Sequence, residues 1–247
     1  MKALITGASS GLGKALSQYL SKYNYEVVMI ARNKEALVDL QKELLNPSEI
    51  IIADLSKHED VMKVTSFIEK NNIDILVNNA GIGYLGEFWN IPINYEKVML
   101  EVNMIAPTLL MKAYIKTHNV GRIINIASIA ACQVDPFMAG YGASKAYLKM
   151  LSSSVQIELQ HSSKSIMIHT CLSGSFISNF DKQANVKNSL AVISSEVIAE
   201  KIMKDVFRNK KIIVPGFKNK CAYYISKIIP EKIMGKIEYK LQKNKKQ

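Results

Sequence analysis

The 247-residue chain has little cysteine: Cys132, Cys171 and Cys221 are scattered, odd in number, and form no C-x-x-C pair. This pattern excludes a disulfide framework and is typical of free thiols in a reducing compartment. No apolar stretch in the sequence approaches the length that spans a bilayer, and the N-terminal segment "ALI" is too short for a signal peptide. We therefore expect a cytoplasmic protein, and we predict no metal site.

Acidic residues are few, with 21 Asp and Glu against 32 Lys and Arg, and the net charge is +11. The excess is local: residues 218–247 hold nine lysines against two glutamates, a balance of +7, and the other residues carry only +4. A basic surface over the whole protein would indicate nucleic acid. A basic C-terminal segment on a nearly neutral body argues against that partner.

Apolar residues recur every four positions in this basic segment, at Ile225, Ile229, Ile233, Ile237 and Leu241. The spacing predicts an amphipathic helix that is interrupted at Pro230. Such a helix can cover an apolar patch of protein or lie on an anionic membrane surface. We favour packing on protein, keep a weak membrane contact as the alternative, and treat residues 218–247 as a C-terminal extension.

Residues 1–217 alternate between apolar, strand-like runs and amphipathic, helix-like runs. The expected strands are 2–6, 26–31, 49–53, 74–78, 122–127, 165–171 and 211–215, and the expected helices are about 13–23, 33–45, 57–71, 94–118, 141–162 and 195–208. Strands that are apolar throughout are buried on both faces. The alternation therefore predicts one α/β domain, a three-layer doubly wound parallel sheet with helices on both faces.

The stretch "TGASSGLG", residues 6–13, joins the first expected strand to the first expected helix. Glycine allows unusual backbone angles and lets a ligand approach the backbone closely. The free N–H groups at the helix start favour an anion, so the turn is a candidate phosphate site. A glycine pattern alone is weak evidence, and a tight turn without a ligand is the alternative.

Four further signals follow in order along the chain: "NNAG" at 78–81, Asn103 in a helix, Ser128 at a strand end, and "YGASK" with Tyr141 and Lys145. Residues four apart on a helix share a face, so Tyr141 and Lys145 point into the same space. In this order and spacing, from Thr6 to about Pro215, the chain resembles the short-chain dehydrogenase/reductase family. The resemblance implies a Rossmann fold, a nicotinamide cofactor and a homodimer or homotetramer formed through helices 94–118 and 141–162.

The resemblance also implies roles for four catalytic residues. Tyr141 exchanges a proton with the substrate oxygen, and a cation at Lys145 favours its phenolate form. Ser128 steadies charge on the same oxygen. Lys145 also holds the nicotinamide ribose, and Asn103 holds a water that links Lys145 to solvent. Asn103 as a purely structural helix residue stays open.

The cofactor preference rests on the end of the second strand. An acid there binds the 2′-hydroxyl of NAD, whereas an arginine accommodates the 2′-phosphate of NADP. Here Ala31 is followed by Arg32, so we favour NADP(H) and keep NAD(H) as possible. The predicted cofactor contacts are Gly7, Ser9, Ser10, Gly11, Leu12, Gly13, Arg32, Asp54, Leu55, Asn79, Ala80, Gly81, Tyr141, Lys145, Gly174 and Ile177.

The substrate is less clearly indicated. Ser173 stands where the family usually has proline, and residues 175–194 resemble a substrate lid. Between Ser128 and Tyr141, apolar side chains at Ala131, Val134, Phe137 and Met138 favour an apolar ketone, aldehyde or 3-oxoacyl group. The sequence thus predicts an NADP(H)-dependent carbonyl reductase or alcohol dehydrogenase. The alternative is an NADP-binding sensor or regulatory protein that turns nothing over.

Overall fold

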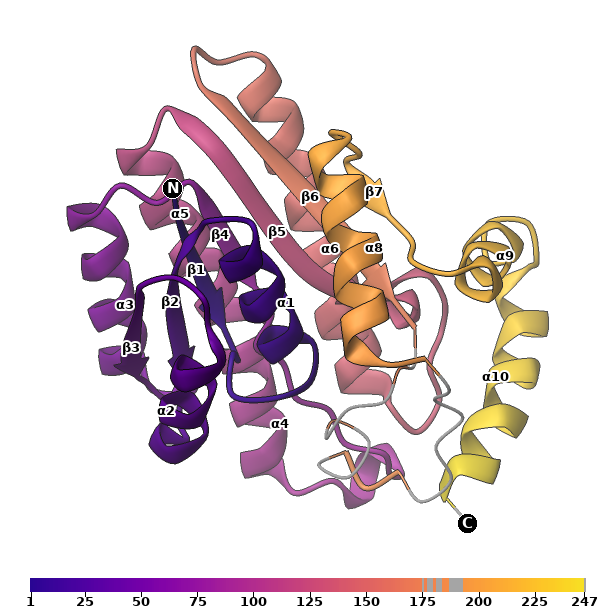
Figure 1. The fold of residues 1–247 in the computed structure, drawn as a ribbon. Coiled ribbons are helices and arrows are strands. Elements are labelled where there is room, and N and C mark those ends of the chain that lie inside the picture. Colours follow the sequence, from indigo (N-terminus) through magenta and orange to yellow (C-terminus); the bar gives the residue numbers. More distant parts are fainter. Residues whose placement is uncertain (175, 177–179, 181–183, 187–192, 247) are drawn as a thin grey trace.

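The core of the molecule is a seven-stranded, wholly parallel sheet (Figure 1). The computed structural model describes residues 1–174, 176, 180, 184–186 and 193–246. The strands are β1 (Lys2–Thr6), β2 (Glu26–Ala31), β3 (Ser48–Ile52), β4 (Ile75–Asn78), β5 (Val120–Ser128), β6 (Ser165–Ser173) and β7 (Ile212–Ile213). Their order is β3-β2-β1-β4-β5-β6-β7, so the chain reverses direction across the sheet between β1 and β4.

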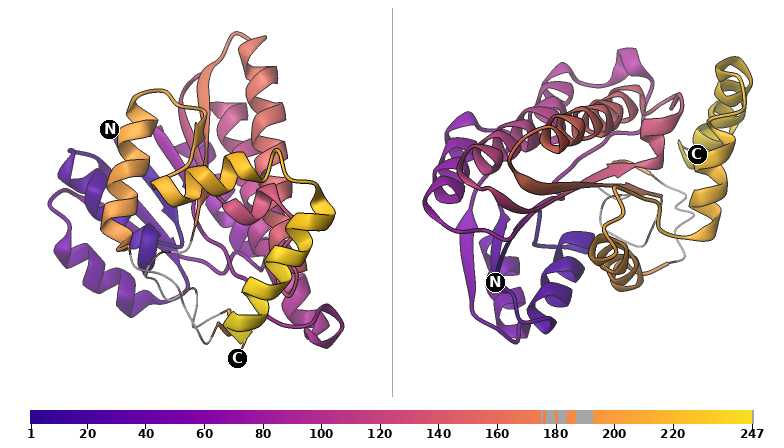
Figure 2. Two further views of the ribbon diagram at one scale, coloured as in Figure 1. Left: turned by 90° about the vertical axis from the view of Figure 1, so that its right-hand side faces the viewer. Right: turned by 90° about the horizontal axis from the view of Figure 1, so that it is seen from above.

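Helices cover both faces of this sheet, and Figure 2 shows the three layers. One face carries α1 (Gly11–Lys22), α2 (Lys34–Glu43) and α8 (Ser195–Phe207). The other carries α3 (His58–Lys70), α5 (Ala106–Thr117) and α6 (Ala139–Gln160). Because each face has its own cluster of fully buried apolar side chains, β1, β2 and β4 are apolar on both sides. The predicted fold class is confirmed.

A continuous helix precedes β5, and it combines α4 (Ile93–Leu100), a π-helical turn (Glu101–Ile105) and α5. It runs for 25 residues and is long and apolar enough to cross a membrane, which corrects our expectation that no stretch approaches that length. Half of its apolar window is buried, and α5 packs against the sheet and alongside α3. These contacts are those of a core helix in a folded domain.

The C-terminal extension forms two helices beyond the sheet, α9 (Phe217–Ile225) and α10 (Glu231–Lys246), separated near Pro230 (Figures 1 and 2). The predicted helix and its break are therefore present. The face that packs on protein differs from the expected one. Met234 and Gln242 are buried, whereas Ile233 and Ile237 are 52% and 43% exposed.

Candidate active site

A cavity of about 1080 Å³ lies at the carboxyl ends of the strands. Its wall runs from the glycine turn after β1, past Asn79 and Gly81 after β4, to Ser128, Tyr141 and Lys145. Ligands of open parallel sheets bind at this edge, where the strand order reverses. The structure thus brings the predicted cofactor turn and the predicted catalytic residues to one cavity.

The glycine turn and the "NNAG" segment hold each other in place. The Thr6 Oγ1 atom accepts hydrogen bonds from the Asn79 and Ala80 backbone N–H groups, both at 3.0 Å. The Asn79 Nδ2 atom donates to the Thr6 and Gly7 carbonyls at 2.9 and 3.2 Å. Gly7 has φ +67°, and a Cβ there would lie 2.9 Å from the Ala80 Cα. Asn79 therefore shapes the turn, and Thr6 is a site residue that the sequence analysis missed.

Beyond the buried Ala8, four residues of this motif line the cavity, namely Ser9, Ser10, Gly11 and Leu12. Gly13 has a different role. A Cβ at Gly13 would lie 2.1 Å from the Gly7 carbonyl oxygen, so this glycine allows α1 to pack against the turn. The first turn of α1 contains no acidic side chain, which leaves its N-terminus favourable for an anion.

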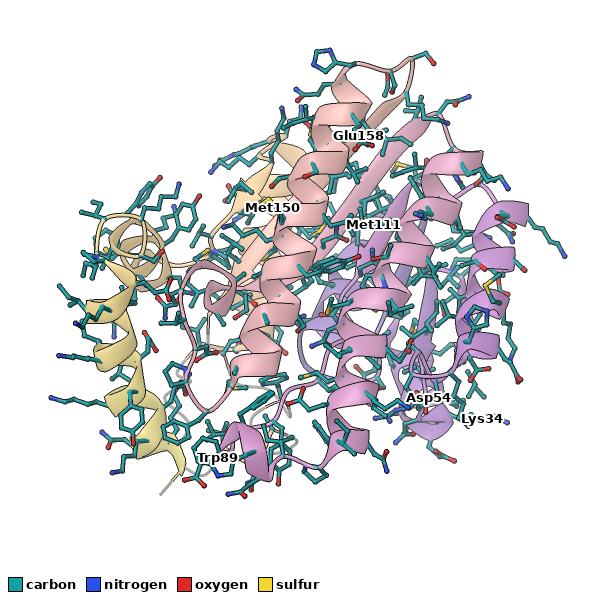
Figure 3. All side chains as sticks on the ribbon, turned by 180° about the vertical axis from the view of Figure 1, so that it is seen from behind. Lys34, Asp54, Trp89, Met111, Met150 and Glu158 are labelled. Atoms are coloured by element: carbon teal, nitrogen blue, oxygen red, sulfur yellow. The ribbon has the colours of Figure 1, made fainter. Side chains whose placement is uncertain are left out.

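The cavity extends along the ends of β2 and β3, where Arg32, Asp54 and Leu55 contribute to its wall. Figure 3 shows Asp54 and Lys34 together at this end of the molecule. The Asp54 carboxylate accepts hydrogen bonds from the Ser56 backbone N–H and hydroxyl groups, at 3.1 and 2.8 Å, so its contacts are made within its own turn. Within the described part of the chain, the exposed Arg32 guanidinium makes no hydrogen bond or ion pair.

Lys145 lies on α6 and is 4% exposed. Its Nζ atom donates to the Ile126 carbonyl at 3.0 Å and lies 5.8 Å from the centroid of the Tyr141 ring. Burial lowers the pKa of Lys145 to about 8, because the charged form loses water. A Cβ at Gly81 would lie 2.9 Å from the same Nζ atom, so Gly81 leaves room for the ammonium group.

Asn103 lies in the π-helical turn and is 1% exposed. Its Oδ1 atom accepts from the Ile82 N–H at 3.0 Å, and its Nδ2 atom donates to the Ile82 carbonyl and the Ser144 hydroxyl at 2.8 and 2.9 Å. The Ser144 hydroxyl in turn donates to the Tyr141 carbonyl at 2.7 Å. The Asn103 side chain therefore ties the segment after "NNAG" to α6, and Ser144 is a second residue that sequence reasoning missed.

Ser128 and Tyr141 reach the cavity from different elements. Ser128 ends β5, is 8% exposed, and its hydroxyl accepts the Ala130 N–H at 3.2 Å. The Tyr141 ring lies 5.3 Å, between centroids, from the Phe180 ring. An apolar cluster surrounds Tyr141, with Leu85, Met138, Ala184, Phe137, Phe180 and Val186. Apolar surroundings suit a hydrophobic substrate beside the Tyr141 hydroxyl.

The predicted apolar wall between Ser128 and Tyr141 is only partly correct. Met138 lines the cavity, but Val134 faces Gly235, and the Phe137 ring lies 5.1 Å from the Tyr239 ring of α10. Ala131 packs in a separate cluster with Ala127, Leu172 and Val214. The α10 helix covers this loop, and the sequence carries no signal for that contact.

Polar groups also enter the cavity wall, and α10 supplies three of them: Glu238, Gln242 and Lys245. Asp135, from the loop, also lines the cavity and is 8% exposed. The Gln242 Nε2 atom donates to the Asp135 carboxylate. Burial raises the pKa of Asp135 to about 6, although this hydrogen bond lowers it. The cavity wall is therefore more polar than predicted.

At the end of β6, Ser173 and Gly174 line the cavity. The Ser173 hydroxyl donates to the Ala127 carbonyl at 3.1 Å, which fixes the segment where the family usually has proline. A Cβ at Gly174 would lie 2.2 Å from the Asn219 Oδ1 atom of α9. The predicted contact Ile177 lies outside the described residues, as does most of the segment 175–194 that we interpreted as a lid.

Comparison with known proteins decides the family. The sequence profile described as short chain dehydrogenase matches residues 1–189. The chain belongs to this family. An uncharacterised oxidoreductase of Staphylococcus epidermidis is 30% identical over 163 residues, which cover 64% of this chain and 70% of that protein. The family resemblance inferred from the ordered motifs is thus confirmed, and the chain is a short-chain dehydrogenase of the oxidoreductase type.

Two further relatives differ in what is known of them. A bulky-bulky ketone specific alcohol dehydrogenase of Comamonas testosteroni superposes with a TM-score of 0.78 at 25% identity, over 93% of this chain and 95% of that one. The human protein called inactive hydroxysteroid dehydrogenase-like protein 1 is 28% identical over 180 residues, which cover 69% of this chain and 54% of that protein. Family membership therefore does not by itself decide turnover.

Proposed function

We propose that this short-chain dehydrogenase is an NADP(H)-dependent carbonyl reductase or alcohol dehydrogenase. The observation that carries the proposal is the single cavity, which joins an anion-binding glycine turn to Ser128, Tyr141 and Lys145. Glycines at positions 7 and 11 with φ of +67° and +52° allow close backbone approach, as a dinucleotide pyrophosphate requires. The residues present fit a nicotinamide dinucleotide, which when bound supplies or accepts the hydride.

The chain's own residues supply the proton chemistry. Tyr141 gives its hydroxyl proton to the carbonyl oxygen during reduction and removes a proton from the alcohol during oxidation. The Lys145 ammonium, 5.8 Å from the ring centroid, stabilises the phenolate that reduction leaves behind. Ser128 donates a hydrogen bond to the reacting oxygen. Asn103 positions this group through Ile82 and Ser144, and its role in a water relay remains part of the proposal.

The preference for NADP(H) rests on Arg32. It is exposed at the cavity wall after β2, to which Ser9 and Ser10 also contribute, and can bind a 2′-phosphate by a charge-assisted hydrogen bond. The position at the end of β2 that would bind the 2′-hydroxyl of NAD carries the short apolar side chain of Ala31.

The substrate we propose is a bulky, mainly apolar carbonyl compound. The apolar cluster around Tyr141 supports this class, and the ketone specificity stated for the Comamonas relative agrees with it. Asp135 and Gln242 in the cavity wall favour a compound that also carries a polar group.

The test is NADPH consumption with a panel of bulky ketones, aldehydes and acyl thioesters, run in parallel with NADH. We expect turnover with NADPH that falls by at least about 10³-fold in the Tyr141→Phe protein, because the proton donor is removed. Tyr147→Phe is the matched control. Tyr147 lies on α6 like Tyr141, but its hydroxyl bonds Thr108 of α5 at 3.1 Å, so its loss should leave turnover unchanged. Equal rates for the wild type and Tyr141→Phe would contradict the proposed mechanism.

A cofactor-binding protein without turnover is the second candidate, and the inactive human relative favours it. Tight NADPH binding without consumption of any panel member would support that reading. Retention of Ser128, Tyr141 and Lys145 at one cavity is the observation against it.

We also infer self-association through α4–α5 and α6. Apolar side chains on these helices are exposed, with Met150 and Ile157 on α6 at 66% and 58% (Figure 3 shows Met150). Light scattering should give a dimer or tetramer, and Met150→Asp should shift it toward the monomer.

A further inference from the structure

The C-terminal helices leave an apolar surface uncovered after α10 has packed on the body. We call it the α9–α10 surface and define it by the exposed side chains of Phe217, Tyr224, Ile225, Ile228, Ile233, Ile237 and Leu241. Phe217 and Ile228 are the most exposed, at 82% and 81%. An apolar surface of this kind, rimmed by polar groups, indicates a binding surface.

The rotation of α10 is fixed by contacts on its other side. Met234, Glu238 and Gln242 recur every four residues and face the body, and the Gln242 amide donates to Asp135. Ile233, Ile237 and Leu241 each precede one of these residues, so their row is turned by about 100° from the packed row. The isoleucine row cannot turn inward without breaking the bond to Asp135.

Positive charge accompanies the apolar row. Seven lysines of α9, α10 and their connection are exposed: Lys218, Lys220, Lys227, Lys232, Lys236, Lys240 and Lys243. Acidic residues in 218–247 are only Glu231 and Glu238, and Glu238 is half-buried and hydrogen-bonded to Gln133. The accessible charge beside the apolar row is therefore almost entirely positive.

We propose that the α9–α10 surface binds the surface of an anionic lipid membrane. Isoleucines beside a row of lysines are the pattern of an interfacial helix, whose apolar side chains enter the acyl boundary while the lysines contact anionic headgroups. The charge is complementary to anionic lipid. A nucleic-acid backbone is bound through its phosphate charges and would leave the exposed isoleucines without an apolar partner, so a lipid surface fits better.

The position of the cavity agrees with this occupant. Phe217 and Leu241 belong both to the exposed surface and to the cavity wall, so the apolar surface continues into the cavity. A membrane bound at the α9–α10 surface would lie beside this opening, from which an apolar compound can pass between lipid and cavity.

The proposal is tested with the full-length protein and no substrate or cofactor, by sedimentation with phosphatidylcholine vesicles with and without phosphatidylglycerol. We expect the protein to bind the anionic vesicles, and to bind vesicles of phosphatidylcholine alone at least tenfold more weakly. The Ile228→Ser/Ile233→Ser protein should lose at least tenfold in binding, and so should Lys232→Glu/Lys236→Glu/Lys240→Glu.

Matched controls change equally exposed groups elsewhere. Leu45→Ser/Val120→Ser removes side chains that are 77% and 70% exposed, and Lys57→Glu/Lys63→Glu/Lys70→Glu reverses three exposed lysines at α3. Both controls should bind vesicles as the wild type does. Because all these residues are exposed, the far-UV circular dichroism and the NADPH affinity of every variant should match those of the wild type.

Three results would overturn the proposal: no wild-type binding to anionic vesicles, equal losses in the α9–α10 variants and their controls, or a change of mass in light scattering caused by Ile228→Ser/Ile233→Ser. The last result would assign the surface to a second copy of the chain. Vesicle binding is read without turnover, so its failure is distinct from a failure of the proposed reductase activity.

Discussion

At the scale of single residues, the site contains a cation that the fold would be more stable without. Lys145 is 4% exposed, and its one described hydrogen bond goes to the Ile126 carbonyl. Burial lowers the pKa of Lys145 from 10.5 to about 8, so at pH 7 the folded protein holds a desolvated ammonium group that the unfolded chain keeps in water. The proposed function of Lys145 and the stability of the fold therefore oppose each other at this residue.

Replacing Lys145 with methionine should abolish NADPH-dependent turnover and make the protein more stable at pH 7. The pKa difference corresponds to roughly 3 kcal/mol. Because the variant also loses the hydrogen bond to the Ile126 carbonyl, we expect a net gain of about 1–3 kcal/mol in the free energy of unfolding. Urea denaturation of both proteins measures this gain.

The pH dependence of that gain identifies its cause. Between the folded pKa of about 8 and the unfolded value of 10.5, the unfolded chain binds more protons than the folded protein, so wild-type stability rises with pH. The advantage of Lys145→Met should therefore be full below pH 8 and absent above about pH 10.5. A variant that is less stable than the wild type at pH 7 would show that the ammonium group is compensated.

Gly81 tests the position of the same ammonium group. A Cβ at this residue would lie 2.9 Å from the Lys145 Nζ atom and 3.4 Å from the Asn103 Oδ1 atom. Since a lysine side chain can move, Gly81→Ala should shift the melting temperature little, but we expect kcat to fall about 10- to 100-fold because the charge is displaced. Gly86→Ala is the control, as the atoms nearest its Cβ would be those of the Tyr84 and Ile91 side chains, at 3.3–3.5 Å. Equal kcat values for the two variants would contradict this interpretation.

At the scale of elements, the sequence predicted what depends on local pattern. The strands follow from apolar runs, and the predicted catalytic residues follow from ordered motifs, one at the end of β5 and the others on helices. The cavity at the carboxyl ends of the strands brings Ser128, Tyr141 and Lys145 together. The rotation of α10 about its axis could not be predicted from the sequence. It depends on contacts between distant parts of the chain, such as the hydrogen bond from Gln242 to Asp135, more than a hundred positions away. For the same reason, the polar groups that α10 adds to the cavity wall were missed, and the isoleucine row was expected to be covered.

The contact between α10 and the loop should depend on pH through Asp135. Burial raises the pKa of this carboxyl from 3.8 to about 6, so between these values the folded protein binds more protons than the unfolded chain, and stability falls as pH rises. Asp135→Asn removes this dependence while keeping an acceptor for Gln242. We expect the variant to match the wild type at pH 4 and to be more stable by up to about 3 kcal/mol at pH 7.

Urea denaturation at pH 4, 5, 6 and 7 measures this difference. Asp39→Asn is the control, because burial raises the pKa of Asp135, whereas the pKa of the exposed Asp39 carboxyl is lowered by Lys42. A constant difference between Asp135→Asn and the wild type across this range would mean that the carboxyl titrates normally.

At the scale of the whole molecule, the cavity touches both halves of the sheet. Its wall takes residues from the ends of β1, β2 and β4 and also from the ends of β5 and β6, from α6 and from α10. A dinucleotide that fills it would contact elements far apart in the sequence, and a ligand that binds only the folded state stabilises the entire fold.

NADPH should therefore raise the melting temperature of the wild type. At a free concentration of about 100 Kd the added stability is roughly 2.7 kcal/mol, which corresponds to about 5–10 °C for a domain of this size. Arg32→Ala should remove most of the shift with NADPH and leave the shift with NADH, because only the 2′-phosphate needs the guanidinium. Arg208→Ala, an exposed arginine at the end of α8, should leave both shifts unchanged. If Arg32→Ala reduces both shifts equally, Arg32 contacts a part common to the two cofactors, and the NADP(H) preference loses its basis.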